Sequence, residues 1–179
     1  MITSHSWLLS RKAALARASL LALTCLICTN FTWAADDDEK PWQEMATEAP
    51  KTFSTDQLQT FTVSQNSSLT YGIDPQTLTV GEDWVVRFVM VARSPSGALN
   101  VLYEGIRCQS GEVKTYARWD NNRSAWHTPQ NTTWKPLSLD GATRPATVLA
   151  MEGLCNGNSV NGTPRKMLAT LKTGRYLQR

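Results

Sequence analysis

The sequence has few of the residues and motifs that mark an enzyme active site. Its 179 residues include two histidines, and no serine stands in the glycine-flanked pattern of a nucleophile elbow. No glycine-rich phosphate loop, paired-carboxylate motif or metal-ligand spacing occurs. These absences argue against elbow-type hydrolases, nucleotide-dependent enzymes and metal enzymes. We therefore predict a protein that is not an enzyme and that has neither a cofactor nor a metal site.

Long hydrophobic runs are missing too. A membrane-spanning helix needs about 20 predominantly apolar residues, and the apolar run at 18–27 is shorter. Arg11, Lys12 and Arg17 precede this run, and small residues stand at 34–35. These features together are typical of a secretory signal peptide. We predict a cleaved signal peptide at 1–34, a periplasmic protein that is free or held at the outer membrane, and no transmembrane span after cleavage.

Cysteine is scarce in the mature chain. Cys25 and Cys28 leave with the signal peptide, so Cys108 and Cys155 remain. Two cysteines in an exported protein most simply form one disulfide. A zinc site is the alternative, but it needs more ligands, and His127 is the one histidine left to supply one. We predict the disulfide.

The mature chain also has little net charge. Cleavage removes three bases and no acid, so the formal charge falls from +3 to near zero. Acids nevertheless dominate residues 35–83, and bases dominate from Trp84 onward. We expect residues 35–57 to form an extended acidic lead-in that is solvated; the alternative is a lead-in that lies on the basic domain, with Trp42 as its anchor. Nucleic acid is not expected as a partner, because the protein is exported.

The clearest strand signal lies at residues 85–93. Alternate side chains of a strand point to opposite faces; one face here is wholly apolar, and the other combines valines with Arg87 and Arg93. This pattern indicates a central strand that is covered on both faces. Short turns join it to strands at 99–108 and 113–119. Short connections join antiparallel neighbours, so we predict a meander.

Alternation also assigns the side chains of the second and third strands to faces. In the second strand, one face carries Leu102, Glu104, Ile106 and Cys108, and the other carries Leu99, Val101, Tyr103 and Arg107. In the third strand, the more polar side carries Lys114, Tyr116 and Arg118. Shorter strand signals occur at 58–63, 70–73, 78–80 and 134–137.

A helix follows these strands. Thr143 is a suitable cap, Pro145 falls in the first turn, and Asn156-Gly157 ends the pattern. Val148, Met151 and Cys155 lie on one helical stripe, which we expect to face the sheet near Cys108.

The predicted fold class is α+β: a mostly antiparallel β-sheet (meander), covered by a C-terminal helix and stapled by one disulfide. The predicted domain spans residues 58–155. Residues 156–179 form a basic tail with a short helix at 164–173.

Several segments resemble the cryptic-neisserial-protein-like family. The segments are EKPWQE at 39–44, YGIDPQTLTVG at 71–81 and VARSPSGALNVLYEGIRC at 91–108, with the tyrosine–alanine pair at 116–117. The resemblance covers most of the mature chain and implies an exported bacterial envelope protein, in a family with no established activity. The layout is more distantly similar to surface-adhesin-E-like domains, which are small β-rich modules with one disulfide; a shared fold does not carry function.

Glu104 and His127 are the candidate residues for chemistry. Alternation places Glu104 on the helix-covered face, where a buried carboxylate must find a partner or take up a proton. We expect a structural role, either an ion pair with an arginine such as Arg93, Arg107 or Arg118 or a bond to a helix terminus; the functional alternative is a general acid or a ligand-binding carboxylate. His127 is expected in a polar loop at 124–133, with a solvated ring.

Aromatic residues and arginine are common at binding surfaces, so Tyr103, Arg107, Trp126 and Trp134 join Glu104 as candidate binding residues. We predict a non-enzymatic binding module whose partner is another envelope protein or a polysaccharide. A hydrolase-like enzyme using Glu104 and His127, or a purely structural envelope component, is the alternative.

Overall fold

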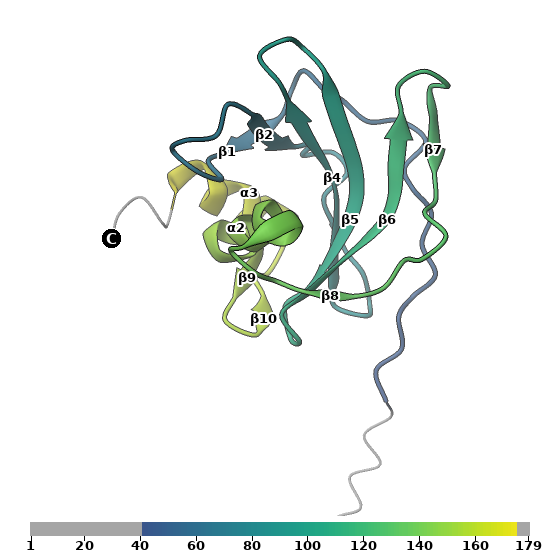
Figure 1. The fold of residues 1–179 in the computed structure, drawn as a ribbon. Helices are drawn as coiled ribbons and strands as arrows, with labels where there is room; N and C mark the ends of the chain where they lie inside the picture. Colours follow the sequence, from purple (N-terminus) through teal and green to yellow (C-terminus); the bar gives the residue numbers. More distant parts are fainter. Residues whose placement is uncertain (1–40, 175–179) are drawn as a thin grey trace, which may run out of the picture. The chain divides into compact units, whose positions relative to one another are not determined.

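The structure, a computed structural model, describes residues 41–174. The predicted signal peptide, the start of the acidic lead-in and residues 175–179 lie outside this range. From Trp42 onward the chain forms one unit, in which a curved sheet wraps around two helices (Figure 1).

The sheet follows the predicted antiparallel meander. Its main path runs in the order β1-β2-β4-β5-β6-β7, with β3 paired to β4 and β8 paired to β6. The strands are β1 Gln59–Phe61, β2 Thr70–Ile73, β3 Thr79–Val80, β4 Val85–Arg93, β5 Leu99–Arg107, β6 Glu112–Asp120, β7 Ala125–His127 and β8 Lys135–Pro136. The predicted α+β class, with its mostly antiparallel sheet, C-terminal helix and disulfide, is confirmed.

Strand β7 corrects one prediction. We expected His127 in a polar loop, but residues 125–127 pair with β6, so that Arg118 faces His127. The preceding turn explains the pairing: the Asp120 carboxylate accepts hydrogen bonds from the backbone N–H groups of Asn122 and Arg123. This Asx turn reverses the chain tightly enough to bring a short polar segment back onto the sheet edge.

Strand β4 is the centre of the fold. Its residues from Val85 to Ala92 are all buried, as expected for a strand covered on both faces. Val86, Phe88 and Met90 belong to the core under the helices, whereas Val89 and Val91 belong to a second core on the opposite face. Even Arg87 is buried, with its guanidinium 2.6 Å from the Asp83 carboxylate.

The helix layer begins where predicted but ends earlier. Helix α2, Arg144–Leu149, continues into a π-helical turn, η2, at Ala150–Leu154, and Cys155 already belongs to strand β9, Cys155–Asn156. A π turn is wider than an α turn, so it rotates the residues that follow. Met151 is therefore 38 % exposed, contrary to the predicted stripe, while Leu149 and Leu154 face the core.

A 3-10 turn, η1 at Gly141–Thr143, precedes α2, and strand β10, Ser159–Val160, pairs with β9. The last element is helix α3, Pro164–Thr173, at the predicted position. The Thr163 side chain accepts a hydrogen bond from the backbone N–H of Lys166, and Gly174 takes the left-handed conformation at the other end. Met167 and Leu171 are buried in the core of the helix face. The hydrophobic core therefore includes residues that lie after the predicted domain, 58–155.

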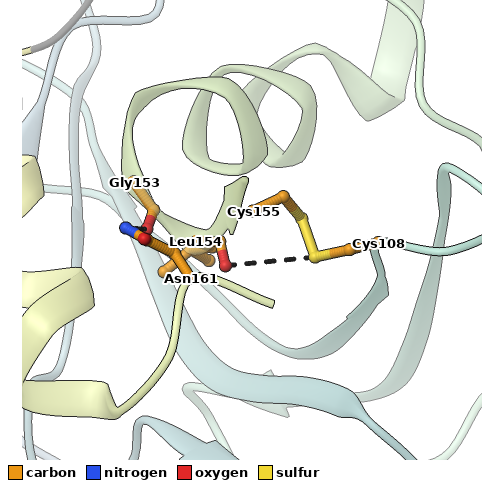
Figure 2. Close-up of a disulfide and its surroundings, with 5 residues drawn as sticks. All are labelled: Cys108, Gly153, Leu154, Cys155 and Asn161. Carbon is orange, nitrogen blue, oxygen red and sulfur yellow. Dashed lines mark hydrogen bonds between the residues drawn. A yellow bond between two sulfur atoms is a disulfide. The ribbon is translucent and has the colours of Figure 1, made fainter. Parts of the chain in front are cut away.

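The disulfide between Cys108 and Cys155 fastens the helix layer to the end of β5 (Figure 2). The two Cα atoms are 5.7 Å apart, and 47 residues separate the cysteines in sequence. Next to it, the Asn161 side-chain amide donates a hydrogen bond to the carbonyl of Gly153 at 2.8 Å, which ties the π turn to the chain leading into α3.

Residues 42–57, which we call the N-terminal strap, lie on the other face of the sheet (Figure 1). The Trp42 indole N–H donates to the carbonyl of Asp83 at 2.9 Å, and the Arg107 guanidinium stacks 3.8 Å above its ring centroid. Phe53 packs against Trp119 and Trp126, with ring centroids 4.9 and 5.2 Å away. This part of the lead-in is therefore docked on the domain, not solvated, and Trp42 is its anchor.

Removing the disulfide should destabilise the protein strongly. Closing a loop of this length restricts the unfolded chain, which corresponds to about 4 kcal/mol. We expect the Cys108→Ala/Cys155→Ala double variant to lose about that much free energy of unfolding in urea titrations. The wild-type protein under reducing conditions is the control, and equal stability of oxidised wild type and double variant would contradict the assignment.

Phe53→Ala tests whether the strap is part of the core. A half-buried aromatic in two ring contacts should contribute about 2 kcal/mol to the free energy of unfolding. Met45→Ala is the matched control in the same strap, because Met45 is 43 % exposed and should change stability by less than about 0.5 kcal/mol. Both are measured by chemical denaturation followed by tryptophan fluorescence; similar effects of the two changes would contradict a docked strap.

Candidate functional site

A β-bulge in strand β6 shapes the candidate site. Tyr103 pairs with Ala117 and Glu104 pairs with Thr115, so Tyr116 is the extra residue on the β6 side. A bulge of this kind changes which face the following side chains take. Tyr116 and Ala117 therefore both belong to the strap-face core.

The bulge overturns one predicted face. Strict alternation puts Lys114, Tyr116 and Arg118 on the same side, but only the first two lie there: the Lys114 ammonium is 5.3 Å from the Tyr116 ring centroid. Arg118, beyond the bulge, lines a cavity on the helix face together with Glu104.

Gly105 makes room for the bulged tyrosine. A Cβ atom at this position would come within 2.7 Å of the Tyr116 ring and 2.8 Å of Val85. The absence of a side chain lets the ring of Tyr116 lie across β5. The glycine next to Glu104 thus helps to place Glu104, Thr115 and Arg118 on a common face.

Glu104 is a buried carboxyl group with one satisfied oxygen. It lies on β5 with 6 % of its surface exposed. Its Oε1 accepts a hydrogen bond from the Thr115 hydroxyl at 2.9 Å, while Oε2 is buried and has no hydrogen-bond partner among the described residues. An unsatisfied buried oxygen is costly in a folded protein, and it marks a place where a ligand could supply the missing partner.

Burial also changes the acidity of Glu104. Loss of hydration raises the pKa of Glu104 to about 7 from an ordinary value of 4.5, against the opposing effects of the Thr115 hydrogen bond and the positive charge of Arg118. Near neutral pH the group exists in both protonation states, so it can donate as well as accept a hydrogen bond.

The expected ion pair of Glu104 is absent from the described residues. Arg93 donates to the carbonyl of Thr55 and lies 3.7 Å from Asp56, Arg107 stacks on Trp42, and Arg118 donates to the Asn100 side chain. Arg107 lies on the opposite face of β5, because odd-numbered residues there point away from Glu104. The ion-pair prediction is therefore wrong, and Thr115 is the partner.

The cavity that Glu104 faces lies on the helix side of the sheet, and we call it the sheet–helix cleft. Its volume is about 890 Å³, within the range of small-molecule sites, about 300–1,000 Å³. Apolar wall residues include Val63, Leu69, Tyr71, Met90, Leu102 and Val113. The segments at 129–133 and 141–145 complete its border.

The charged groups of the cleft are distributed unevenly. Among the described residues, Glu104 is the one acid that lines the cleft, and it is buried. Arg118, Lys135 and Arg144 also line the cleft and are exposed, and His127 is exposed at the same border. The cleft thus combines apolar walls and one inner carboxyl group with an outer set of bases.

The other four candidate binding residues lie on the strap face. The Tyr103 hydroxyl is 2.9 Å from the hydroxyl of Thr47, and the Trp126 indole donates to the carbonyl of Pro50. The Trp134 indole donates to Glu44 at 3.2 Å, and Arg107 covers Trp42. The structure therefore brings Tyr103, Arg107, Trp126 and Trp134 together under the strap and leaves Glu104 on the opposite face.

Sequence reasoning missed three residues of the cleft, Thr115, Lys135 and Arg144, and named Arg118 as a partner of Glu104 while placing it on the wrong face. Thr115 resembles an ordinary strand residue. Lys135 and Arg144 come from a proline-containing edge strand and the first turn of α2, and no sequence pattern links them to β5. Without a bulge, the register would place Tyr116 of β6 directly opposite Glu104. The bulge shifts the register by one residue, so Thr115 takes this position.

None of the helices within residues 41–174 is both long and apolar enough to cross a membrane. In the same part of the chain, no three His, Cys, Asp or Glu side chains lie close enough together to hold a metal ion.

Comparison with known proteins confirms the resemblance noted above. The family model described as the CNP1-like family matches residues 37–172. No curated protein and no solved structure matches the chain significantly.

Replacing Glu104 by glutamine should stabilise the protein in a pH-dependent way. Between pH 4.5 and about 7 the folded chain keeps a proton that the unfolded chain has released, so the stability of the wild type falls as the pH rises through this window and stays lower above it. Glutamine cannot ionise. The free energy of unfolding of Glu104→Gln should therefore exceed that of the wild type by almost nothing at the acidic end of this range and by as much as about 3 kcal/mol above pH 7.

Urea unfolding across this pH range measures the difference. Thr115→Val is the companion variant: it removes a hydrogen bond that favours the ionised carboxylate, so the pKa of Glu104 should rise further. A difference between Glu104→Gln and wild type that is the same at every pH would contradict the proposed burial.

Proposed function

The chain belongs to the CNP1-like family, and we propose that it is a non-enzymatic binding protein of the bacterial envelope whose ligand occupies the sheet–helix cleft. The observation that carries the proposal is the buried Oε2 of Glu104, which has no partner among the described residues and faces the cleft. A ligand with a hydrogen-bonding group would remove this deficit.

The cleft walls support a ligand with an apolar body. Leu69 is 39 % exposed, and Val63 and Tyr71 are half-buried. A ligand that packs on these walls removes apolar surface from water, which favours binding by about 25 cal/mol per Å². The hydrogen bond to Glu104 would then add orientation and selectivity, because few polar groups are needed to fix a ligand in an apolar pocket.

The strap face is less suited to this role. Its aromatic residues and Arg107 already contact residues 42–57 of the same chain. Binding of another envelope protein or a polysaccharide there would require the strap to leave. We therefore assign the binding role to the cleft and regard Tyr103, Arg107, Trp126 and Trp134 as partners of the strap.

The periplasm remains our proposal for the location. It is supported by the basic flank, short apolar run and small residues at the start of the sequence, and by the disulfide, which persists in oxidising compartments.

A hydrolase-like activity is a second candidate, favoured by one observation: Glu104 and His127 line the same cleft. Glu104 would act as the general acid and His127 as the base. Turnover of nitrophenyl esters distinguishes the two functions. A binding protein leaves their hydrolysis at the buffer rate, whereas an enzyme accelerates it and loses that acceleration in Glu104→Gln.

Ligand binding can be tested with a neutral fluorescent probe. N-phenyl-1-naphthylamine should bind the wild type with an increase in fluorescence, and Ala98→Trp should weaken binding at least about tenfold by filling the border of the cleft. Ser96→Trp is the matched control, because Ser96 lies in the same turn and does not line the cleft. Equal probe binding by all three proteins, or none by the wild type, would contradict a ligand site in the cleft.

A further inference from the structure

We propose that the cleft binds an anionic amphiphile: a molecule with an acyl-chain-like apolar body and one carboxylate or phosphate head, held apolar end first with its head at Arg118, Lys135 and Arg144. This inference rests on the proposed function and specifies the ligand class.

The first argument is the lack of acidic partners for the three bases. On the strap face, Arg87 pairs with Asp83, Lys114 pairs with Glu44 at 2.8 Å, and Arg107 stacks on the Trp42 ring. Within residues 41–174, none of the ion pairs includes Arg118, Lys135 or Arg144. Three exposed bases that line one cleft, none of them in an ion pair within the described residues, create a positive potential that attracts an anion.

The geometry of Arg118 suits an anionic head. One of its terminal nitrogens donates to the Asn100 side chain, which holds the guanidinium in place beside the cleft. A guanidinium has five N–H donors, so donors remain for an oxyanion. Lys135 on β8 and Arg144 at the start of α2 line the same cleft from other elements, so each offers a further positive charge to an anionic head.

The second argument concerns orientation. An anion at the inner end would lie next to Glu104 in apolar surroundings, where like charges repel strongly because little water screens them. At the outer end the same anion meets bases and solvent. The chain of the amphiphile would enter first and lie against the apolar walls, and a hydroxyl or amide group on it would reach Oε2 of Glu104.

The test compares probes that share one chain length and differ in the head group. Dodecanoate, dodecyl phosphate, dodecanol and dodecyltrimethylammonium are titrated against the protein loaded with N-phenyl-1-naphthylamine, and displacement is followed by fluorescence. We expect the two anions to bind at least about tenfold more tightly than the cation, with the preference weakening as salt rises.

Two charge reversals test the assigned residues. Lys135→Glu and Arg144→Glu should each weaken dodecanoate binding roughly five- to tenfold more than they weaken binding of the neutral probe. Arg165→Glu is the matched control, because Arg165 is an exposed base on α3 outside the cleft. Near-UV circular dichroism establishes that each variant is folded.

The outcomes separate the two proposals. Binding of the neutral probe without any preference for anions would overturn the amphiphile assignment and leave the cleft as a ligand site. Failure of the neutral probe to bind would overturn the proposed function itself.

A further experiment distinguishes a membrane phospholipid from a free fatty acid as the natural ligand. The protein is incubated with phosphatidylglycerol vesicles and reisolated. A phospholipid that comes away with the protein indicates a membrane lipid as the source, and its absence alongside dodecanoate binding indicates a free fatty acid.

Discussion

The whole structure depends on strand β4 being buried on both faces. A strand with apolar side chains on both sides cannot sit on a two-layer domain with one face in water. The helix layer covers one side, and the N-terminal strap covers the other. One segment before the sheet and one after it are therefore needed to stabilise the sheet, and together they leave little of β4 exposed to solvent.

The two faces differ in how their charges are satisfied. On the strap face, acids from the first part of the chain meet bases from the second: Glu44 reaches Lys114, and Asp83 reaches Arg87. Two acids from the acidic half of the sequence and two bases from the basic half thus form ion pairs on this face of the sheet. On the helix face, one buried carboxyl group and several exposed bases border an open cleft, and the ion pairs found within residues 41–174 include none of these groups. The strap face is therefore largely satisfied by contacts within the chain, whereas the cleft keeps polar and charged groups that a ligand can engage.

The sequence predicted the regular parts of this fold well and the irregular parts poorly. Alternation located β4 to the residue and placed Glu104, Ile106 and Cys108 on the helix face, because an uninterrupted strand obeys a period of two. Alternation gave the wrong face for Arg118, because the extra residue at Tyr116 reverses the facing of the β6 side chains that follow it. The helix start was visible in Thr143 and Pro145, whereas the π turn that exposes Met151 depends on packing that no local pattern reports.

The candidate site was predictable only in part for the same reason. The burial of Glu104 follows from its strand neighbours, but its environment is assembled from β6, β8 and α2, and the bulge decides which β6 side chains face it. Long-range packing of this kind cannot be inferred from one sequence. The strap was misjudged because its charges suggested solvent, while Trp42 and Phe53 provide the apolar contacts that dock it.

The strap has a consequence for the order of folding. Its contacts are distant in sequence: Glu44 meets Trp134 90 residues later, and Trp126 meets Pro50 across 76 residues. A chain made from its N-terminus produces the strap first, before any of the surface it will cover exists. Contacts between residues far apart form slowly, because a large loop must close first. The strap face of the sheet, rich in aromatic residues, therefore stays uncovered until the meander is complete, and this interval is when the nascent protein most needs protection from aggregation.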